Sequence, residues 1–322
     1  MSRFDVSVVG ELNLDLILYG LPEKLELERE HLAKSLSITL GSSSAIFAHN
    51  LACLGNKVGF SSGIGNDSLG EICKERLAEA KVDLSEVKKF PGKITGLTII
   101  LPQGAGRYIL TYPGTMHDLK FDDLDFDYIL AAKHLHVSSY FLQTGLRRDF
   151  AELFRRAKES GLTTSFDTND DPEDRWSDDV QDMLRYVDVF LPNESEACKI
   201  TKAEDLDAAA RILSKQVSLL VVKRGARGGV AWRGDEKIVA PAVTATAIDS
   251  VGAGDSFDAG FVHQFIRGAA VQDCLRFANL TGALSVTRAG GTEAFRDTAH
   301  REHFLKGGCA GSQPAAPHSP SG

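Results

Sequence analysis

Short apolar runs recur along the chain and alternate with longer amphipathic stretches. The runs read as buried strands, and the clearest of them lie at residues 6–9, 58–62, 162–166, 187–191 and 219–222. In the stretches between them, apolar residues recur three and four positions apart, the spacing of one helix face; two examples are 150–157 and 275–284. Strands that alternate with helices are typical of a doubly wound, mostly parallel sheet flanked by helices. The pattern therefore predicts an α/β fold.

Two regions depart from this alternation, at Leu14–Leu40 and Lys93–Gly114. Both contain extended, alternating segments without a convincing helix between them, so we expect them to form a small separate β-sheet. The last residues are small, polar and rich in proline, and they cannot bury enough apolar area to order themselves. The predicted division is an α/β core from 1–11, 41–92 and 116–306, a small β-sheet from 12–40 and 93–115, and a disordered tail at 307–322.

Composition narrows the function classes. The 322 residues, of which 43% are hydrophobic, suffice for one large domain with a sizeable core. No run of about eighteen apolar residues occurs and the N-terminus enters a strand pattern directly, so we expect a cytoplasmic protein. The formal net charge of −8 argues against nucleic acid and anionic membranes as partners. The five cysteines are scattered and never form a C-x-x-C pair, which indicates neither a disulfide framework nor a zinc site.

The strongest local signal is a glycine-rich stretch, residues 249–257, which reads D-S-V-G-A-G-D-S-F and precedes an amphipathic run. Small residues at 252–254 let free backbone N–H groups converge on a point, and the dipole of the following helix adds positive charge there, which suits a phosphoryl group. A carboxylate at Asp255 would repel that group unless it accepts a proton from an attacking hydroxyl while the amides hold the phosphoryl group in transit. A plain helix start, with Asp255 as a capping residue, explains the bare G-A-G-D string equally well.

The stretch 249–257 resembles the D-T-x-G-A-G-D-x-F signature of the ribokinase-like (PfkB) sugar kinases, with Ser250 in place of threonine. Further stretches resemble other motifs of that family in the family's order: G-E-L-N-L-D at 10–15, G-N-D-S-L-G at 65–70, P-N-E-S-E at 192–196, K-R-G-A-R-G at 223–228, and F-A-N with G-A in a helix at 277–283. The resemblance implies an ATP-dependent carbohydrate kinase with Mg²⁺ as cofactor. It also implies that the small β-sheet is a lid that excludes water from the reaction.

The resemblance assigns roles to the residues around the phosphate groups. Asp255 is the implied catalytic base. The implied anion hole for the γ-phosphate consists of the amides of Gly252, Ala253 and Gly254. Asn193 and Glu196 are expected to help place Mg²⁺ through water, because a spacing of three puts both side chains on one side of a helical turn. The same pair also fits a helix N-cap with a capping box, and the two interpretations are compatible.

The implied nucleotide site follows the strand at 219–222. Gly225 and Gly228 bracket a turn where missing side chains let the backbone approach a nucleotide, although a plain strand-to-strand turn explains them as well. Lys223 stands where the family usually has threonine. Its charged group either contacts a phosphate or lies in solvent at the end of the strand. The nucleotide-binding residues that we expect are Asn193, Glu196, Lys223, Gly225, Gly228, Asn279 and Ala283.

The implied substrate side is polar. Asn13 and Asp15, two apart on the first-strand motif, point the same way and can bind hydroxyls, or they form the polar face of a half-buried strand. Arg107 either reaches an acidic substrate or is an ordinary exposed hairpin arginine. The substrate-binding residues that we expect are Asn13, Asp15, Gly41, Ser42, Ser43, Ile46, Arg107 and Ser139.

The second substrate element departs from the family. Residues 41–46 read G-S-S-S-A-I where the family usually reads G-G-x-x-x-N, so Ser42 replaces a glycine and Ile46 an asparagine. Loss of that amide removes a hydroxyl contact, so the substrate is expected to lack a hydroxyl there or to carry an apolar portion. A nucleoside kinase therefore stays open as an alternative to a sugar kinase. A catalytically weak nucleotide- and sugar-binding protein is the other alternative.

The resemblance has two further implications. A monovalent cation, K⁺, would bind the carbonyl oxygens of Asp249 and Val251, together with the loop around Gly290 and Gly291. Lids of this family often pair, so a homodimer through the small β-sheet is also expected.

Two other patterns point to different chemistry but are incomplete. The stretch 63–68 nearly spells a dinucleotide-binding fingerprint, but its third glycine is Ser68 and the acidic Asp83 sits in a loop-like segment. His134 and His136 lie two apart on an expected strand, without a third metal ligand nearby, so they fit a core or pocket position better.

Overall fold

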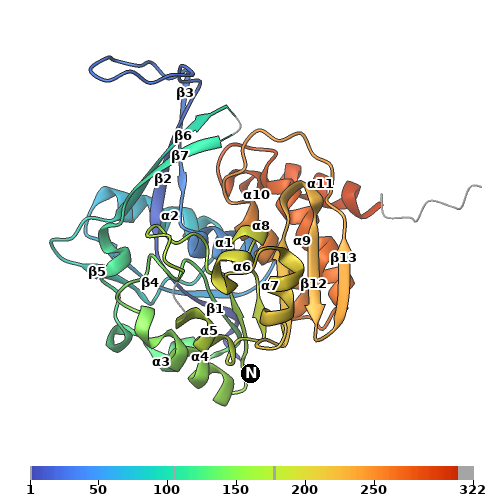
Figure 1. The fold of residues 1–322 in the computed structure, drawn as a ribbon. Helices are drawn as coiled ribbons and strands as arrows, with labels where there is room; N and C mark the ends of the chain where they lie inside the picture. The colour runs from blue at the N-terminus through green and yellow to red at the C-terminus, as the bar shows by residue number, and fades with distance from the viewer. Residues whose placement is uncertain (1, 105, 177–178, 311–322) are drawn as a thin grey trace, which may run out of the picture.

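A nine-stranded sheet runs through the centre of the protein (Figure 1). The structure is a computed structural model that describes residues 2–104, 106–176 and 179–310, with side chains up to Gly307. In spatial order the strands are β13 (Glu236–Ala240), β12 (Gly229–Arg233), β11 (Leu219–Lys223), β10 (Val189–Phe190), β9 (Thr163–Phe166), β8 (Ala132–Val137), β1 (Phe4–Val9), β4 (Val58–Gly65) and β5 (Val87–Phe90). All neighbours pair in parallel except β11–β12 and β12–β13. The predicted doubly wound, mostly parallel sheet is confirmed.

Helices cover both faces of this sheet, which is why inner strands such as β1, β4 and β11 are buried along almost their whole length. On β11, Leu220 and Val222 join the core beneath one layer of helices, whereas Leu219 and Val221 pack into the core on the other face. The helices are α1 (Ser43–Cys53), α2 (Ser68–Glu79), α3 (Phe126–Ile129), α4 (Phe150–Glu159), α5 (Asp179–Leu184), α6 (Glu194–Thr201), α7 (Leu206–Leu213), α8 (Ala253–Phe265), α9 (Val271–Ser285), α10 (Glu293–Arg296) and α11 (Thr298–Ala310). Of these, α1, α2, α8 and α9 share one face, and α3–α7 share the other.

A second, four-stranded sheet stands at the edge of the core (Figure 1). Its order is β3 (Ser35–Leu40), β2 (Asn13–Tyr19), β6 (Gly96–Gln103) and β7 (Gly106–Tyr112). Only residues 10–12 separate β2 from the end of β1, so the small sheet begins at the carboxyl edge of the large sheet. Ligands of open α/β sheets bind at that edge. The predicted second sheet is confirmed.

The C-terminal boundary differs from the expectation. Helix α11 continues to Ala310, so the first residues of the segment 307–322, for which disorder was expected, are helical. The rest of that segment lies outside the described residues. Among the residues that the structure describes, none of the helices is both long and apolar enough to span a lipid bilayer.

Candidate active site

The glycine-rich stretch forms the N-terminus of α8. Gly252 is the N-cap residue, with a φ of 72° that favours glycine. A Cβ atom on Gly252 would also lie 2.5 Å from the Cα atom of Gly291, so no other residue fits without a backbone shift. The N–H group of Ala253 points to the carbonyl oxygen of Ser250 at 3.4 Å, whereas those of Gly252 and Gly254 have no acceptor among the described residues. Two of the three predicted anion-hole donors are therefore unengaged.

Asp255 lies beside these amides, in the first turn of α8, and only 8% of it is exposed. Burial raises the pKa of its carboxyl group to about 6, although the charge of Lys223 and the hydroxyl of Ser43 lower it. The group is therefore mostly ionised at neutral pH and can accept a proton. The N-cap is Gly252 and forms no side-chain cap, so Asp255 is not the capping residue that the alternative interpretation required.

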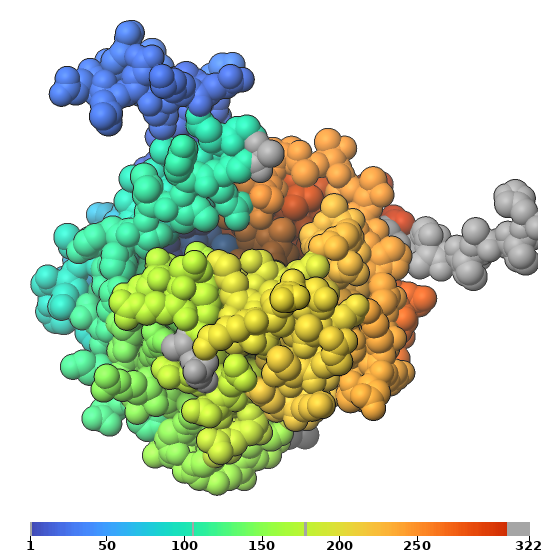
Figure 2. All heavy atoms as spheres, viewed as in Figure 1, coloured from blue at the N-terminus to red at the C-terminus, as the bar shows by residue number. Residues whose placement is uncertain are grey.

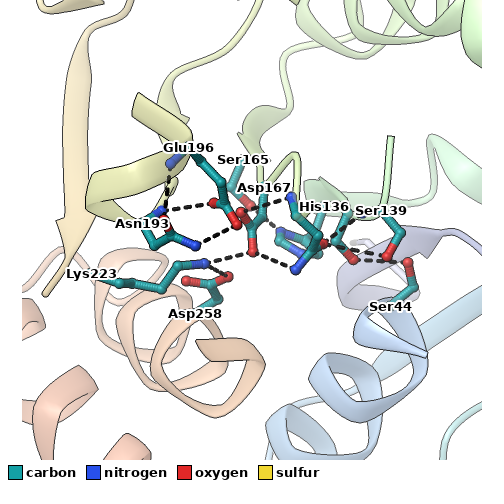
Figure 3. A network of polar contacts seen from close by, with 11 residues as sticks. Ser44, His136, Ser139, Ser165, Asp167, Asn193, Glu196, Lys223 and Asp258 are labelled. Carbon is teal, nitrogen blue, oxygen red and sulfur yellow. Dashed lines mark hydrogen bonds and ion pairs between the residues drawn. The ribbon is translucent and has the colours of Figure 1, made fainter. Parts of the chain in front are cut away.

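Lys223 carries a buried positive charge next to this turn (Figure 3). Its Nζ atom lies 2.6 Å from Asp167 and 3.0 Å from Asp258, and the side chains of both carboxylates are at most 1% exposed. Burial lowers the pKa of Lys223, but the two carboxylates outweigh burial and raise it above its usual value. A Cβ atom on Gly254 would lie 3.7 Å from the Lys223 side chain. The interpretation of Lys223 as a solvated strand end is therefore wrong.

Asn193 and Glu196 begin helix α6, beside the end of β11 (Figure 3). Asn193 Oδ1 accepts from the Glu196 N–H group at 3.0 Å, and Glu196 Oε2 accepts from the Asn193 N–H group at 2.8 Å. Both halves of the predicted capping box are present. Burial and the charge of Asp167 raise the pKa of Glu196 to about 8.

Asn13 and Asp15 lie on the same face of β2, and both are almost fully buried. Asn13 Nδ2 donates to Thr98 at 3.1 Å and lies 3.4 Å from Asp15 Oδ1. Burial and, after it, the negative charge of Asp255 raise the pKa of Asp15 to about 7. A Cβ atom on Gly41 would lie 2.2 Å from Asp15 Oδ1, so glycine is needed there. The structure thus brings Asp15 of the first-strand motif close enough to Asp255 for their charges to interact.

The small sheet reaches the signature loop through two side chains. Tyr19 on β2 donates to Asp249 Oδ2 at 2.7 Å, and Arg107 on β7 donates to Ser250 Oγ at 3.0 Å. Figure 2 shows a hollow between the small sheet and the C-terminal part of the core. Arg107 is exposed, as an ordinary hairpin arginine would be, yet its charge also acts on Asp15. It therefore lies at the mouth of the region that holds Asp15 and Asp255.

A model of the pfkB family carbohydrate kinases matches residues 3–298. The chain belongs to this family. It is 26% identical to an uncharacterized sugar kinase of Archaeoglobus fulgidus, over 76% of this chain and 96% of the relative. It is 28% identical to an ATP-dependent ribose-1-phosphate kinase of Halopiger xanaduensis, over 88% of this chain and 93% of the relative. Among solved structures, the apo form of a putative ribokinase II from E. coli covers 94% of this chain, with a TM-score of 0.83, 23% identity and 99% of its own length matched.

The predicted family, fold and enzyme class of this carbohydrate kinase are confirmed. Its departures from the family pattern have a structural explanation at Ser42, the N-cap of α1, whose φ is 66°. Glycine adopts that conformation more easily, which accounts for the usual second glycine. The Ser42 Oγ atom lies 2.6 Å from the carbonyl oxygen of Glu11 and accepts from the Ala45 N–H group at 3.1 Å. These contacts offset the backbone strain.

Ile46 lies beneath the signature loop of this pfkB-family kinase. Its side chain is 3% exposed and so close to Gly252 and Gly291 that Cβ atoms on these glycines would lie 3.2 Å and 2.6 Å from it. The side chain therefore supports the two glycines that bring the signature loop and the loop at 290–291 together.

The predicted nucleotide residues of the kinase are largely engaged with its own chain. Gly225 and Gly228 have φ values of 54° and 81° and form the turn from β11 to β12, so the plain-turn interpretation holds for their backbone. Asn279 on α9 donates to the carbonyl oxygens of Ala240 and Pro241, at 3.1 Å and 3.0 Å. Ala283 lies one turn further along the same helix and is 9% exposed.

Several residues that the sequence did not single out belong to this site. Asp167 and Asn169 follow β9, and Asn169 Oδ1 accepts from the Ser139 N–H group at 2.8 Å. Glu11, 3% exposed, accepts from the Ser44 hydroxyl at 2.6 Å. The carboxyl ends of parallel strands meet at one edge, so the position of Asp167 directly after an expected strand was a usable signal. No such signal marked Asp258 in the sequence, because only its distance from Lys223 in the fold shows that the two form an ion pair.

The two incomplete motifs have structural roles in the kinase. Asp67 is the N-cap of α2 and accepts from the Gly70 N–H group at 2.8 Å, whereas Asp83 lies outside the named strands. His134 and His136 are fully buried on β8, and Ser165 Oγ lies 2.7 Å from a ring nitrogen of each. No group of three or more His, Cys, Asp or Glu side chains is arranged to hold a metal ion within the part of the chain that the structure describes.

Proposed function

We propose that this kinase transfers the γ-phosphate of ATP to a hydroxyl group of a sugar or sugar-like molecule, with Asp255 as the general base. One observation carries the proposal: the Asp255 carboxylate stands at the N-terminus of α8 beside the N–H groups of Gly252 and Gly254, which have no acceptor among the described residues. A base and an anion hole on one helical turn serve the nucleophile and the phosphoryl group at the same time.

In this mechanism the substrate hydroxyl donates its proton to Asp255 as its oxygen attacks the γ-phosphorus in line. The bond between the γ-phosphorus and the bridging oxygen breaks, and ADP leaves with the electron pair. The amides of Gly252, Ala253 and Gly254 stabilise the charge on the transferred group. For Ala253, this requires that its weak contact with Ser250 be exchanged for the phosphate.

The cofactor side combines Lys223 with Asn193 and Glu196. The permanent positive charge of Lys223 lies next to Gly254, where it can attract the phosphates of ATP. Mg²⁺, when bound, neutralises phosphate charge. The oxygens of Glu196 already bond with Asn193, which fits a hydrated ion held through water better than direct ligation. The E. coli ribokinase II is also described in complex with ATP and Mg²⁺ (TM-score 0.80, 22% identity).

The nucleotide would lie along the turn of Gly225 and Gly228 and against α9 near Asn279 and Ala283. Gly225 leaves the backbone accessible, since a Cβ atom there would meet nothing within 4 Å, whereas Gly228 packs closely against the backbone at 240–242. Asn279 holds the backbone at 240–241 and would shape this site rather than bond to the base.

The substrate would lie between β2 and the N-terminus of α1, with hydroxyl groups bound by Asn13 and Asp15. Gly41, Ser42, Ser43, Ile46 and Ser139 would complete this side. Arg107 favours a substrate with an anionic group, and one relative is named as a kinase of the anionic ribose 1-phosphate. The case for a nucleoside depends on Ile46 as an apolar contact for the substrate.

A K⁺ ion would bind near the carbonyl oxygens of Asp249 and Val251. Gly290 donates its N–H group to Asp249 Oδ2 at 2.9 Å, and this bond brings the loop at 290–291 to the signature as the site requires. Turnover in potassium chloride should exceed turnover in sodium chloride at equal ionic strength, and equal rates would contradict the site.

A homodimer would form through the small sheet. Every residue of β7 is exposed, and several large apolar side chains of the sheet are about half exposed: Leu36, Ile38, Tyr108, Ile109, Leu110 and Tyr112. A patch of this kind marks an interaction surface. Light scattering should give twice the chain mass, and Leu110→Lys should return the mass to that of one chain.

The function is tested by ADP release with a panel of sugars, sugar phosphates, sugar acids and nucleosides. We expect at least one panel member to release ADP in proportion to its own phosphorylation. Thermal stabilisation by ATP without ADP release from any member would instead favour the catalytically weak binding protein.

A further inference from the structure

A second pocket lies away from the signature loop. It has a volume of about 350 Å³ and is lined by residues of the C-terminal half of α1, the end of α2, and the α10–α11 region. The predicted substrate residues Ser42 and Ser43 lie at the opposite end of α1. A volume near 350 Å³ is within the usual range for small-molecule sites.

The lining of this pocket is rich in positive charge. Lys81, Arg296 and Arg301 contribute three cations, against one carboxylate, Glu79. Arg296 already pairs with Glu79 and Glu293, each at 2.7 Å. Arg301 donates to the carbonyl oxygen of Phe295, and within the described residues neither Arg301 nor Lys81 has a carboxylate partner. Two positive charges are therefore available to an anion.

A buried histidine adds a second, independent feature. His49 lines the pocket, is 0% exposed, and its Nε2 atom has no hydrogen-bond partner among the described residues. Buried polar atoms of this kind are rare and require an explanation. Burial lowers the pKa of His49 to about 4, so the ring is neutral at physiological pH.

The neighbours of His49 determine which ring nitrogen carries the proton. Asn50 Nδ2 lies 3.0 Å from the carbonyl oxygen of Gly291, which can only accept, so this atom is the donating amide nitrogen. Asn50 Oδ1, which can only accept, lies 2.8 Å from His49 Nδ1. His49 Nδ1 must therefore carry the proton, and Nε2 is an acceptor without a donor. A matching ligand needs a hydroxyl group as well as negative charge.

We propose that this pocket binds a phosphate compound with a hydroxyl group. The hydroxyl is on the phosphorus in hydrogen phosphate and on the attached sugar in a sugar phosphate. Lys81 and Arg301 neutralise its charge, and a hydroxyl of the ligand donates to His49 Nε2. Sulfate has the same shape and charge but no hydroxyl at neutral pH, so it satisfies only half of the site.

The pocket is connected to the signature helix by hydrogen bonds. Asn50, which accepts from His49, also donates to Ser256 Oγ at 2.9 Å. Ser256 follows Asp255 directly, and its hydroxyl donates to the Gly252 carbonyl oxygen at 2.7 Å. His49 therefore lies two hydrogen bonds from Ser256, on the turn that carries the proposed base.

Cys53 provides a readout that does not depend on activity. It lines the pocket, 3.9 Å from His49 Nδ1, and is a partly exposed free thiol. Cys198 on α6 is also free and partly exposed but lies outside the pocket, so it serves as the internal control. Rates of iodoacetamide labelling at both cysteines can be followed by peptide mass spectrometry. The non-hydrolysable analogue AMP-PNP with Mg²⁺ is kept in excess, so that the anion hole of α8 is already occupied.

Phosphate at ten times its Kd should slow labelling of Cys53 about tenfold and leave Cys198 unchanged. Ribose 5-phosphate tests for an organic phosphate as the better ligand, and sulfate should protect much less than either. Equal protection by sulfate would overturn the claim that the ligand needs a hydroxyl group. An absence of selective protection by both phosphates would overturn the site.

Lys81→Gly is the matching variant. Lys81 has a φ of 64°, which glycine adopts without strain, so the substitution removes the charge without disturbing the backbone. Lys202, with a φ of 56°, gives the control Lys202→Gly for the same change elsewhere. Protection of Cys53 should require at least tenfold more phosphate in Lys81→Gly and the same concentration in Lys202→Gly. Unchanged protection in Lys81→Gly would refute the proposed role of this charge.

Discussion

The hydroxyl group of Tyr19 donates a hydrogen bond of 2.7 Å to Asp249, and so joins the second strand of the chain to a loop 230 residues later. Asp249 also accepts from the N–H groups of Val251 and Gly290, so one carboxylate ties together the small sheet, the signature and the loop at 290–291. The small sheet is thus held over the segment that leads into Asp255, where a lid would exclude water from phosphoryl transfer.

Arg107 should select for anionic substrates. Arg107→Gln keeps a hydrogen-bonding side chain but removes the charge, and a charge-assisted hydrogen bond is worth about 1.5–3 kcal/mol. We expect KM for an anionic substrate to rise about tenfold or more, with little change in kcat or in KM for ATP. Arg233→Gln, on the exposed end of β12, is the control. An unchanged KM for every anionic substrate would remove Arg107 from the substrate site.

Gly252 and Gly254 should respond differently to alanine. Gly252→Ala places a Cβ atom 2.5 Å from the Gly291 backbone at a φ of 72°, so we expect a loss of about 1–3 kcal/mol in stability together with loss of activity. Gly254→Ala meets only ordinary contacts, at 3.7 Å or more, and should melt at or above the wild-type temperature. Its turnover should nevertheless fall, because a methyl group then crowds the phosphate. Full activity in Gly254→Ala would show that this amide does not approach the transferred group.

Lys223→Met should destabilise the fold. It leaves Asp167 and Asp258 buried without a counter-charge, which costs about 3–5 kcal/mol in comparable cases. The loss should be greatest at high pH and smaller at low pH, because the stranded carboxylates can then become neutral. Adding Asp258→Asn should restore part of the stability. Equal melting temperatures for Lys223→Met and the wild type would contradict the structural importance of this ion cluster.

The sequence predicted what is local, and it missed what depends on contacts between distant segments. The signature at 249–257 combines glycines and a carboxylate within a few residues, so its chemistry can be predicted from that segment alone. The ion pairs of Lys223 cannot be predicted in this way, because Asp167 lies 56 residues away and Asp258 lies 35 residues away. The packing of Ile46 under Gly252 and Gly291 could not be predicted either, because nothing in its own segment indicates it. At the C-terminus, composition indicated disorder from residue 307, but α11 extends to Ala310.

The pH profile should report the ionisation of the base. The pKa of Asp255 is raised to about 6, and the base works only when ionised, so kcat/KM should fall at least tenfold per pH unit well below pH 6. The same shift has the opposite effect on stability: the folded state favours the protonated carboxyl group, so this group stabilises the fold at low pH and loses that contribution as the pH rises from about 4 through about 6. Activity that is undiminished at pH 5 would contradict Asp255 as the base.

The most direct test of the central claim is the turnover of Asp255→Asn. The amide keeps the size of the side chain but cannot accept the proton, so kcat should fall by about 10² to 10⁴. The melting temperature should not fall, because the variant removes a buried carboxylate whose charged form is disfavoured. Asp207→Asn, in the first turn of α7, should leave both quantities unchanged. Turnover of a folded Asp255→Asn protein at the wild-type rate would show that the transferred proton goes elsewhere.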